Sequence, residues 1–275
     1  MIYLKRVTLP IIEKNRYVYP GNVVSSLALG EILLRDITVF YGSNGSGKST
    51  MLNLIANKIG CERTTTFDPV SIYDTESGKL ISNFDEVSTG LSVYYETDED
   101  NRFIFPADSR LISSQDIFQV VNGNLSKNRR IANNMKNPEF ANFQWDDDEG
   151  SQIAKRKYER EAYARDYVWR IKDLRSNGQE AFDFLDTRIG NDGLYLIDEP
   201  ENCLSPILQK KLAELISTTS RYCGCQYVIS THSPFFLSLQ GAKIYNLDNS
   251  PATCHERWYE LENMQPYFEL FDNKK

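Results

Sequence analysis

The chain has 275 residues, of which 41% are hydrophobic and 25% are charged, and its formal net charge is −7 at pH 7. This composition is typical of a soluble globular protein built as one large domain or two lobes sharing a core, and the acidic balance argues against a surface that binds nucleic acid everywhere. With no run of 18 apolar residues and no secretory signal in the first 15 residues, we expect no membrane insertion and a cytoplasmic location.

The strongest motif lies between a predicted strand and a predicted helix. Residues 37–41 (ITVFY) are apolar and β-prone, as in a buried parallel strand, and apolar positions after residue 50 recur at helical spacing. The residues between them match G-x-x-x-x-G-K-[ST], the pattern of a phosphate-binding loop. We therefore predict that the following residues bind nucleotide: Gly42, Ser43, Asn44, Gly45, Ser46, Gly47, Lys48, Ser49 and Thr50.

The residue types of this loop explain the chemistry. Glycines let backbone N–H groups turn inward around phosphate oxygens, and a helix N-terminus adds donors and partial positive charge. Lys48 is expected to reach the β- and γ-phosphates of ATP, and the Ser49 hydroxyl to be a ligand of Mg²⁺.

Residues 62–108 contain short β-branched or aromatic segments separated by polar turns. This pattern predicts antiparallel strands that form a side sheet, outside the central parallel sheet.

Residues 112–190 are predicted to be mainly helical. Tyr163, Tyr167, Ile171 and Leu174 lie at the spacing of an inward-packing stripe, and Arg156 and Arg160 share a face. Basic side chains gather in residues 121–137 and 151–175. They could form a patch that faces nucleic acid, or only a solvated helix face.

Two later strands end in residues of chemical interest. Residues 194–197 form a predicted buried strand followed by Asp198, which can hold Mg²⁺, and by Glu199, which can orient or deprotonate an attacking water. Residues 226–230 form another strand, and His232 follows it, where parallel sheets place their ligands. His232 could donate a hydrogen bond to the γ-phosphate. Residues 242–247 predict one more strand.

The five cysteines do not suggest disulfides, because their number is odd and their spacing irregular. Cys223, Cys225, Cys254 and His255 do not have the usual zinc spacing, in which two to four residues lie between the paired cysteines. We expect free thiols.

Together these motifs resemble those of ABC-type ATPases, in the branch of SMC-like, RecF-like and OLD-like proteins. The phosphate loop GSNGSGKST, the acidic motif DEPEN (198–202) and the motif THSP (231–234) carry the resemblance. It implies an α/β P-loop ATPase head with a mostly parallel central sheet, an antiparallel side sheet and a helical lobe. Residues 1–111 and 191–275 would form the ATP-binding lobe, and residues 112–190 the helical lobe.

The resemblance also implies roles for weaker features. Gln115 would contact Mg²⁺ or the attacking water and couple the two lobes, although Ser114 or Asp116 could serve the same position. Tyr17 or Tyr19 could stack on adenine, but either is equally a strand or core residue.

The segment Arg175–Gln179 corresponds to the family's L-S-G-G-Q signature and keeps its serine, second glycine and glutamine. The resemblance implies that Ser176, Asn177, Gly178 and Gln179 meet the γ-phosphate of ATP bound to another subunit, so that a homodimer holds two composite ATP sites. Ser205 stands where transporter ATPases have an aspartate.

We expect an ATP- and Mg²⁺-dependent dimeric switch in DNA repair, DNA maintenance or phage defence. The chain has no long coiled coil and no sequence for a nuclease domain after the ATPase, so it should act through a protein partner. The alternatives are the nucleotide-binding subunit of an ABC transporter and a slowly hydrolysing, ATP-bound regulator.

Overall fold

A computed structural model describes residues 1–12, 17–65, 72–74, 79–81, 84–121 and 177–272. Its centre is a seven-stranded sheet in the order β12-β11-β3-β10-β9-β8-β4. The strands are β3 (Ile37–Tyr41), β4 (Glu62–Arg63), β8 (Asp108–Ser113), β9 (Gly193–Asp198), β10 (Gln226–Ser230), β11 (Lys243–Asn246) and β12 (Thr253–His255). All neighbours pair in parallel except β12, which is antiparallel at one edge. The predicted mostly parallel α/β fold is confirmed.

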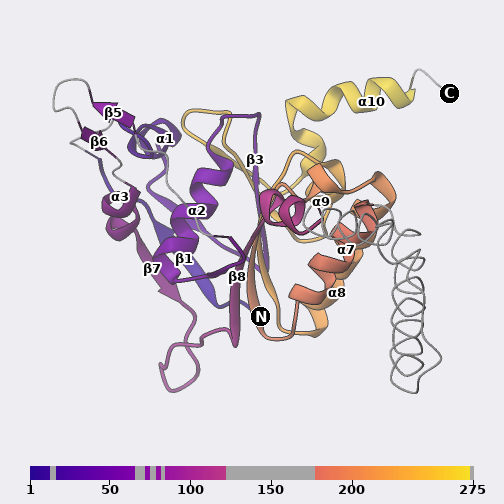
Figure 1. The fold of residues 1–275 in the computed structure, drawn as a ribbon, viewed down its shortest axis with the longest axis horizontal. Coiled ribbons are helices and arrows are strands. Elements are labelled where there is room, and N and C mark those ends of the chain that lie inside the picture. The colour runs from indigo at the N-terminus through magenta and orange to yellow at the C-terminus, as the bar shows by residue number, and fades with distance from the viewer. Residues whose placement is uncertain (13–16, 66–71, 75–78, 82–83, 122–176, 273–275) are drawn as a thin grey trace, which may run out of the picture.

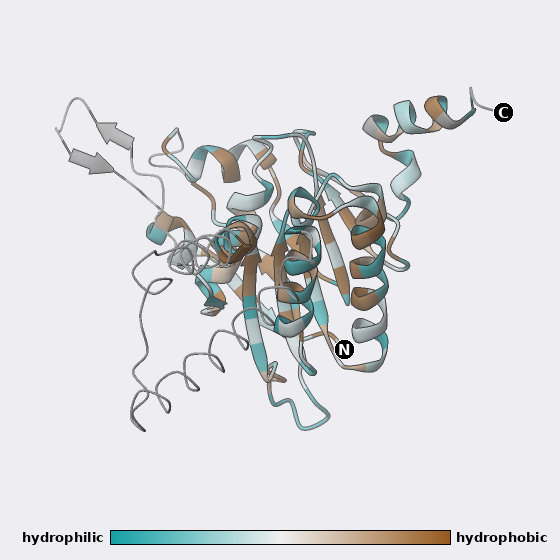
Figure 2. Cartoon of the chain, turned by 45° about the vertical axis from the view of Figure 1, so that its right-hand side comes forward, coloured by the Kyte–Doolittle hydropathy of each residue, from teal (hydrophilic) through white to brown (hydrophobic). Residues whose placement is uncertain are grey.

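Helices cover both faces of this sheet, which explains why its central strands are apolar along their whole length. In Figure 1, α2 (Lys48–Ile59) lies on one side together with α1 (Gly21–Leu27) and α3 (Phe84–Gly90). The other side carries α7 (Asn177–Arg188), α8 (Pro206–Tyr222) and α9 (Pro234–Leu237). Every residue of β3 and β10 is buried. Figure 2 shows brown, hydrophobic segments in the strands between the helices.

The core is divided into two hydrophobic clusters, one on each face of the sheet. Along β3, Phe40 belongs to the cluster of α2, whereas Val39 and Tyr41 belong to the cluster of α8. This is the alternation that a pleated strand imposes. Helix α8 buries Leu208, Leu212 and Ile216, at a spacing of one helical turn.

A separate antiparallel sheet of three strands is present, but only one of its strands comes from residues 62–108, the range from which the side sheet was predicted. It has the order β2-β1-β7, with β1 (Leu4–Thr8), β2 (Glu31–Leu33) and β7 (Ser92–Tyr95). Strands β5 (Ile72–Asp74) and β6 (Lys79–Ile81) pair with each other in a two-stranded sheet.

The prediction that residues 62–108 lie wholly outside the central sheet is wrong at both ends. Strand β4 pairs in parallel with β8 through Glu62 and Arg110, and β8 itself begins at Asp108. A strand of only two residues has no periodicity to detect, which explains why β4 was missed. Helix α3 also interrupts this range.

Of the predicted helical lobe, the structure describes a helix from residue 114 to residue 121 and helix α7. Strand β8 runs to Ser113, two residues beyond the expected lobe boundary. The basic segments beyond residue 121, the tyrosine stripe and Ser176 lie outside the described residues, and the division into lobes stays a prediction.

After β12 the chain forms the short helices η2 (Trp258–Glu260) and η3 (Glu262–Met264) and then α10 (Gln265–Asp272). The ring of Trp258 stacks on Phe268 with centroids 5.6 Å apart, and α10 stands at the upper right of Figure 1. A search of the described helices found none with the length and apolar character needed to cross a membrane.

Candidate functional site

The three principal motifs meet at one edge of the central sheet. Strands β3, β10 and β9 are neighbours, and Ser230 at the end of β10 pairs with Phe40 on one side and Asp198 on the other. Because these strands are parallel, the loops that follow them leave the sheet at the same edge. Segments more than 180 residues apart in sequence, such as 42–49 and 231–234, are thereby brought together.

The phosphate loop joins β3 to α2, and its glycines are required by backbone geometry. Gly45 and Gly47 have φ of 88° and 97°, in the left-handed region. A Cβ at Gly47 would also clash with Cγ1 of Val23, whereas one at Gly45 would meet open space. The loop therefore packs closely on α1 at Gly47 and has free room at Gly45, where a ligand can approach the backbone.

Lys48 begins α2 and is only 3% exposed. Its Nζ donates to the carbonyl oxygens of Gly42 at 2.8 Å and Ser43 at 3.0 Å, and lies 3.3 Å from Oε1 of Glu199. A buried ammonium group needs such partners, because its desolvation is costly. Lys48 thus connects the phosphate loop directly to the acidic motif DEPEN.

Ser49 and Asp198 make the second connection between the two motifs. The Ser49 hydroxyl donates to Oδ1 of Asp198 at 2.9 Å, and the Ser230 hydroxyl donates to the same oxygen. Burial raises the pKa of Asp198, while the hydrogen bonds from Ser230 and Ser49 act in the opposite direction. A hydroxyl and a carboxylate in contact form the oxygen donor set that Mg²⁺ prefers.

Glu199 adopts a left-handed backbone conformation with φ of 47°, which is uncommon for a residue with a side chain. Its backbone N–H donates to Ser230, at 3.0 Å to the carbonyl oxygen and 3.1 Å to the hydroxyl. Its carboxylate accepts a hydrogen bond from Nδ2 of Asn202 at 3.0 Å. The carboxylate is therefore held between Lys48 and Asn202, at the edge of the sheet.

Sequence reasoning missed Glu201, which holds the segment around His232. Oε1 of Glu201 accepts hydrogen bonds from the Thr231 hydroxyl at 2.7 Å and the His232 N–H at 2.8 Å. Glu201 lies in the short helix η1 (Pro200–Cys203) and is buried. The available signal was a third acid in DEPEN, but its partner lies 30 residues further along the chain.

A second missed residue is Asp248, which follows β11. Its Oδ1 accepts hydrogen bonds from the Ser43 N–H at 2.7 Å and the Ser43 hydroxyl at 2.6 Å. Strand β11 is the neighbour of β3, so its end also lies beside the phosphate loop. No motif in the sequence indicates this contact.

Ser114, Gln115 and Asp116, the three alternatives at the expected lobe junction, have different environments. Asp116 is 3% exposed and accepts hydrogen bonds from Thr65 and from the N–H and hydroxyl of Ser113, at 2.8 Å each for Ser113. The Asp116 N–H donates back to the Ser113 hydroxyl at 3.1 Å, so the pair forms a capping box for the helix that begins at residue 114. Ser114 and Gln115 line a cavity of about 330 Å³ together with Asn202 and Cys203.

The other predicted residues are distributed as follows. Tyr17 is 81% exposed, and the Tyr19 hydroxyl lies 3.4 Å from Oγ1 of Thr50. Asn177 begins α7, so that Gly178 and Gln179 fall in its first turn, where backbone N–H groups lack partners within the helix. Nε2 of Gln179 donates to Asp183 at 2.8 Å on the same helix.

The cysteines are all free thiols. Within the described ranges, no group of three or more His, Cys, Asp or Glu side chains is arranged to hold a metal ion. A magnesium ion at Ser49 and Asp198 would therefore need ligands from the nucleotide and from water, as is usual for Mg²⁺ beside phosphates.

The residues of the phosphate loop and the acidic motif fit a nucleoside triphosphate with Mg²⁺. The loop offers a cation, Lys48, and open space at Gly45. Oγ of Ser46 is buried and, among the described residues, has no hydrogen-bond partner. An unsatisfied buried hydroxyl is costly, and a ligand oxygen would satisfy it.

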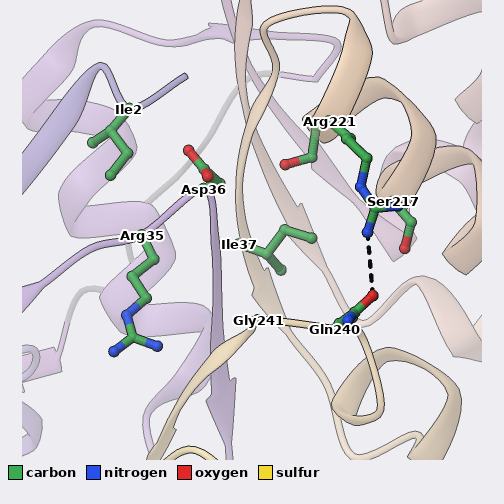
Figure 3. A pocket seen from close by; sticks show the side chains of 9 residues that line it. Ile2, Arg35, Asp36, Ile37, Ser217, Arg221, Gln240 and Gly241 are labelled. Atoms are coloured by element: carbon green, nitrogen blue, oxygen red, sulfur yellow. Dashed lines mark hydrogen bonds between the residues drawn. The ribbon is translucent and has the colours of Figure 1, made fainter.

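Another cavity, of about 460 Å³, lies at the opposite edge of the sheet. Figure 3 shows Asp36 and Ile37 in its lining, at the amino end of β3. It also shows the hydrogen bond that the Arg221 guanidinium donates to Oε1 of Gln240, at 3.2 Å. This cavity is separate from the edge where the phosphate loop lies.

A search of curated proteins found no match. Among solved structures, the Smc head domain of Pyrococcus furiosus bound to the C-terminal domain of ScpA has a TM-score of 0.46 and 12% identity, covering 100% of both chains. The SMC head domain of Thermotoga maritima has a TM-score of 0.41 and 14% identity, covering 92% of this chain and 98% of its own. An ATP-binding cassette of an ABC transporter in the ADP conformation has a TM-score of 0.42 and 15% identity, covering 98% of both chains.

A family profile described as "AAA domain, putative AbiEii toxin, Type IV TA system" matches residues 71–238, more than half of the chain. The matched range includes the signature segment, DEPEN and THSP and begins after the phosphate loop. The chain belongs to this AAA-domain family.

Proposed function

We propose that the protein binds ATP with Mg²⁺ and hydrolyses it to ADP and phosphate. The observation that carries this proposal is the double connection between the phosphate loop and the acidic motif. Ser49 donates to Asp198 at 2.9 Å, and Lys48 lies 3.3 Å from Glu199. Two neighbouring residues of one motif thus contact two neighbouring residues of the other, across about 150 residues of sequence.

In this proposal, the residues of the loop divide the work of binding. The backbone N–H groups of Gly45 to Ser49 and the ammonium of Lys48 bind the phosphates. Ser49 and Asp198 hold Mg²⁺, with Gln115 as a further ligand from the lobe junction. When bound, Mg²⁺ neutralises charge on the phosphates and polarises the bond to be broken.

Glu199 is the proposed general base. Its carboxylate lies at the same sheet edge as Lys48 and is held by Asn202, so it can orient a water for attack on the γ-phosphate. General-base help of this kind is typically worth roughly 10²–10⁴-fold in rate. His232 is the proposed sensor of the γ-phosphate on the neighbouring strand.

We extend the proposal to a homodimer that closes on two ATP molecules. Gly178 lies in the first turn of α7, which supports a role for its N–H in binding an anion. Ser176, Asn177, Gly178 and Gln179 would meet the nucleotide of the second subunit. ATP would then close the dimer and hydrolysis would open it.

The biological role proposed for this switch is phage defence, or DNA repair or maintenance, exerted through a protein partner. The family description names a putative toxin of a toxin–antitoxin system, which supports the proposed role in phage defence. Binding of nucleic acid belongs to the same proposal and would weaken steeply with salt, as counterion release requires.

The test is Glu199→Gln, which keeps the size of the side chain and removes the base. We expect loss of phosphate release while an ATP-dependent dimer accumulates in size-exclusion chromatography with light scattering. Glu214→Gln, at an exposed position of α8, is the matched control and should behave as wild type. A Glu199→Gln protein that still turns over ATP would contradict the base assignment, and one that stays monomeric in saturating ATP would contradict the dimer.

A further inference from the structure

The cavity of about 460 Å³ at the amino end of β3 has the size of a small-molecule site, since such pockets measure roughly 300–1,000 Å³. Four separate parts of the chain line it, namely the segment before β1, the segment that leads into β3, the last turns of α8 and the turn before β11. Figure 3 shows Arg221 and Ser217 on one side of it, and Asp36 and Ile37 on the other. None of the residues proposed for ATP binding or hydrolysis lines this cavity.

Three side chains of α8 that line the cavity lie on one face of the helix. Ser220 and Arg221 come three and four residues after Ser217, the spacing that brings helical side chains together. Ser217 and Ser220 make no side-chain hydrogen bond among the described residues, although Ser220 is only 8% exposed. The two hydroxyls are therefore available to a molecule in the cavity.

The two threonines between these serines behave differently. Thr218 and Thr219 donate to the carbonyl oxygens of Glu214 and Leu215, four residues earlier, at 2.8 Å each. Such a bond to the preceding turn is an ordinary way to satisfy a hydroxyl within a helix. A buried hydroxyl without any partner is costly, so Ser220 needs a partner that the described part of the chain does not supply.

Arg221 brings a positive charge to the same helix face. Among the described residues it forms no ion pair, and its guanidinium donates only to the neutral Oε1 of Gln240, at 3.2 Å. A guanidinium carries five N–H donors in a planar fork. One hydrogen bond fixes the direction of the side chain and leaves most of the fork for a ligand.

The other charged side chains in the lining are already paired. Arg35 lies 2.6 Å from the Glu256 carboxylate, and the Asp36 carboxylate lies 3.3 Å from the amino group of Met1. These pairs compensate the charges of Arg35 and Asp36, whereas the charge of Arg221 has no such partner. Within the described residues, the cavity therefore combines one uncompensated positive charge with two available hydroxyls.

We propose that the cavity binds a small organic anion, a carboxylate or a phosphate monoester with an apolar body. The planar fork of Arg221 matches two oxygens of such a group, and the hydroxyls of Ser217 and Ser220 can donate to the same oxygens. Ile2 and Ile37 give the apolar body a surface to lie on. The proposal concerns binding alone and does not depend on ATP hydrolysis.

Ligand-detected NMR titrations with benzoate and phenyl phosphate test the site, and they distinguish a carboxylate ligand from a phosphate ligand. Benzamide, which has nearly the shape of benzoate without its charge, is the control ligand. We expect saturable binding of at least one of the two anions and no binding of benzamide. Binding of neither anion, or equally tight binding of benzamide, would overturn the proposal.

Arg221→Gln removes the charge at an exposed position of the helix and should fold as the wild type does. We expect it to weaken the binding of the anion at least about tenfold, the worth of a hydrogen bond to a charged group. Arg102→Gln is the matched control, because Arg102 is 77% exposed and lies outside the cavity lining. Equal affinities of the two variants would contradict the assignment of the anion to Arg221.

Ser220→Ala separates a ligand contact from a structural one. Because this hydroxyl has no partner to lose among the described residues, we expect the affinity for the anion to fall about threefold while stability in urea stays unchanged. Thr218→Ala, which removes a hydroxyl bonded within the helix, should leave anion binding unchanged. A Ser220→Ala protein with lower stability and unchanged affinity would contradict the proposed contact.

Two further variants locate the bound anion and test the sign of its charge. Lys48→Ala removes the cation of the phosphate loop, at the opposite edge of the sheet, and should leave binding of the anion unchanged. Loss of binding in Lys48→Ala would place the probe in the phosphate loop and overturn the proposal. Asp36→Asn removes a negative charge from the lining, so the anion should bind as tightly as before or more tightly. Weaker binding to Asp36→Asn would contradict a site that selects anions.

Discussion

Ser43 donates two hydrogen bonds to a single carboxylate oxygen of Asp248, through its backbone N–H at 2.7 Å and its hydroxyl at 2.6 Å. Asp248 is the second residue after β11, and Ser43 is the second residue of the phosphate loop after β3. The contact therefore fixes the entrance of the loop to the end of the neighbouring strand. Hydrogen bonds to a charged group are stronger than those between neutral groups.

Asp248→Ala should destabilise the protein and loosen the phosphate loop. Two hydrogen bonds are lost, and because Ser43 is exposed we expect a loss of only about 1–2 kcal/mol in the free energy of unfolding. Urea unfolding measures it. Asp186→Ala, at an exposed position of α7, is the control and should cost nothing, since alanine favours helix. Equal stability of the two variants would show that the Ser43 contact contributes little.

The central strands could be predicted from sequence because buried parallel strands are nearly continuous apolar runs. Strand β10 has the predicted bounds, 226–230, and β9 and β11 differ from the predicted 194–197 and 242–247 by one residue at each end. Strand β4 could not be predicted, because its two residues, Glu62 and Arg63, carry no apolar pattern and its place is set by pairing with β8.

The residues of the candidate site also fall into two groups, those that the sequence predicts and those that it does not. Lys48, Ser49, Asp198 and Glu199 lie in motifs whose chemistry is local, so their spacing in sequence is informative. Glu201 and Asp248 act through partners 30 and 205 residues away, and the strand order of the sheet alone brings each pair together. No short-range signal distinguishes such an acid from one exposed to solvent.

Lys48→Ala should weaken the binding of ATP at least about tenfold. The ammonium is buried and directed into the loop by Gly42 and Ser43, so its loss removes the loop's own cation. A hydrogen bond to a charged group is worth roughly 1.5–3 kcal/mol, and an affinity loss of at least about tenfold follows. Isothermal titration calorimetry measures it.

Lys58→Ala is the matched control for Lys48, on the same helix. Lys58 is in the last turn of α2 and donates to the carbonyl oxygen of Thr89 at 2.8 Å, away from the loop. Its ATP affinity should equal that of the wild type. Similar losses in both variants would point to damage to α2 and not to a phosphate contact.

Asp198→Asn should make the protein more stable at neutral pH while weakening Mg²⁺-dependent ATP binding. Burial raises the pKa of Asp198 in the folded state, so ionisation of this carboxyl costs stability as the pH rises from its ordinary value, about 3.9, through the raised one. Asparagine removes this cost and still offers an oxygen to Ser49 and Ser230.

Urea unfolding at several pH values tests this sign. The gain from Asp198→Asn should be present above the raised pKa and should shrink as the pH falls toward about 3.9, where aspartate is protonated in both states. Asp186→Asn, at an exposed position, should show no such trend. A gain that grows at acid pH would contradict the direction of the pKa shift.

Ser176→Arg should separate ATP binding from dimerisation. If Ser176 meets a nucleotide held by the other subunit, a bulky cation there blocks closure of the dimer without touching the phosphate loop of its own chain. We expect the ATP affinity of Ser176→Arg to stay within about threefold of the wild type, a change below 1 kcal/mol. The single variant should lose ATP turnover, and the double variant with Glu199→Gln should lose the ATP-dependent dimer. Thr187→Arg, at an exposed position in the last turn of α7, introduces the same side chain and should leave all three intact. An ATP-dependent dimer that persists in Ser176→Arg would place the signature segment outside the interface and restrict the site to residues of one chain.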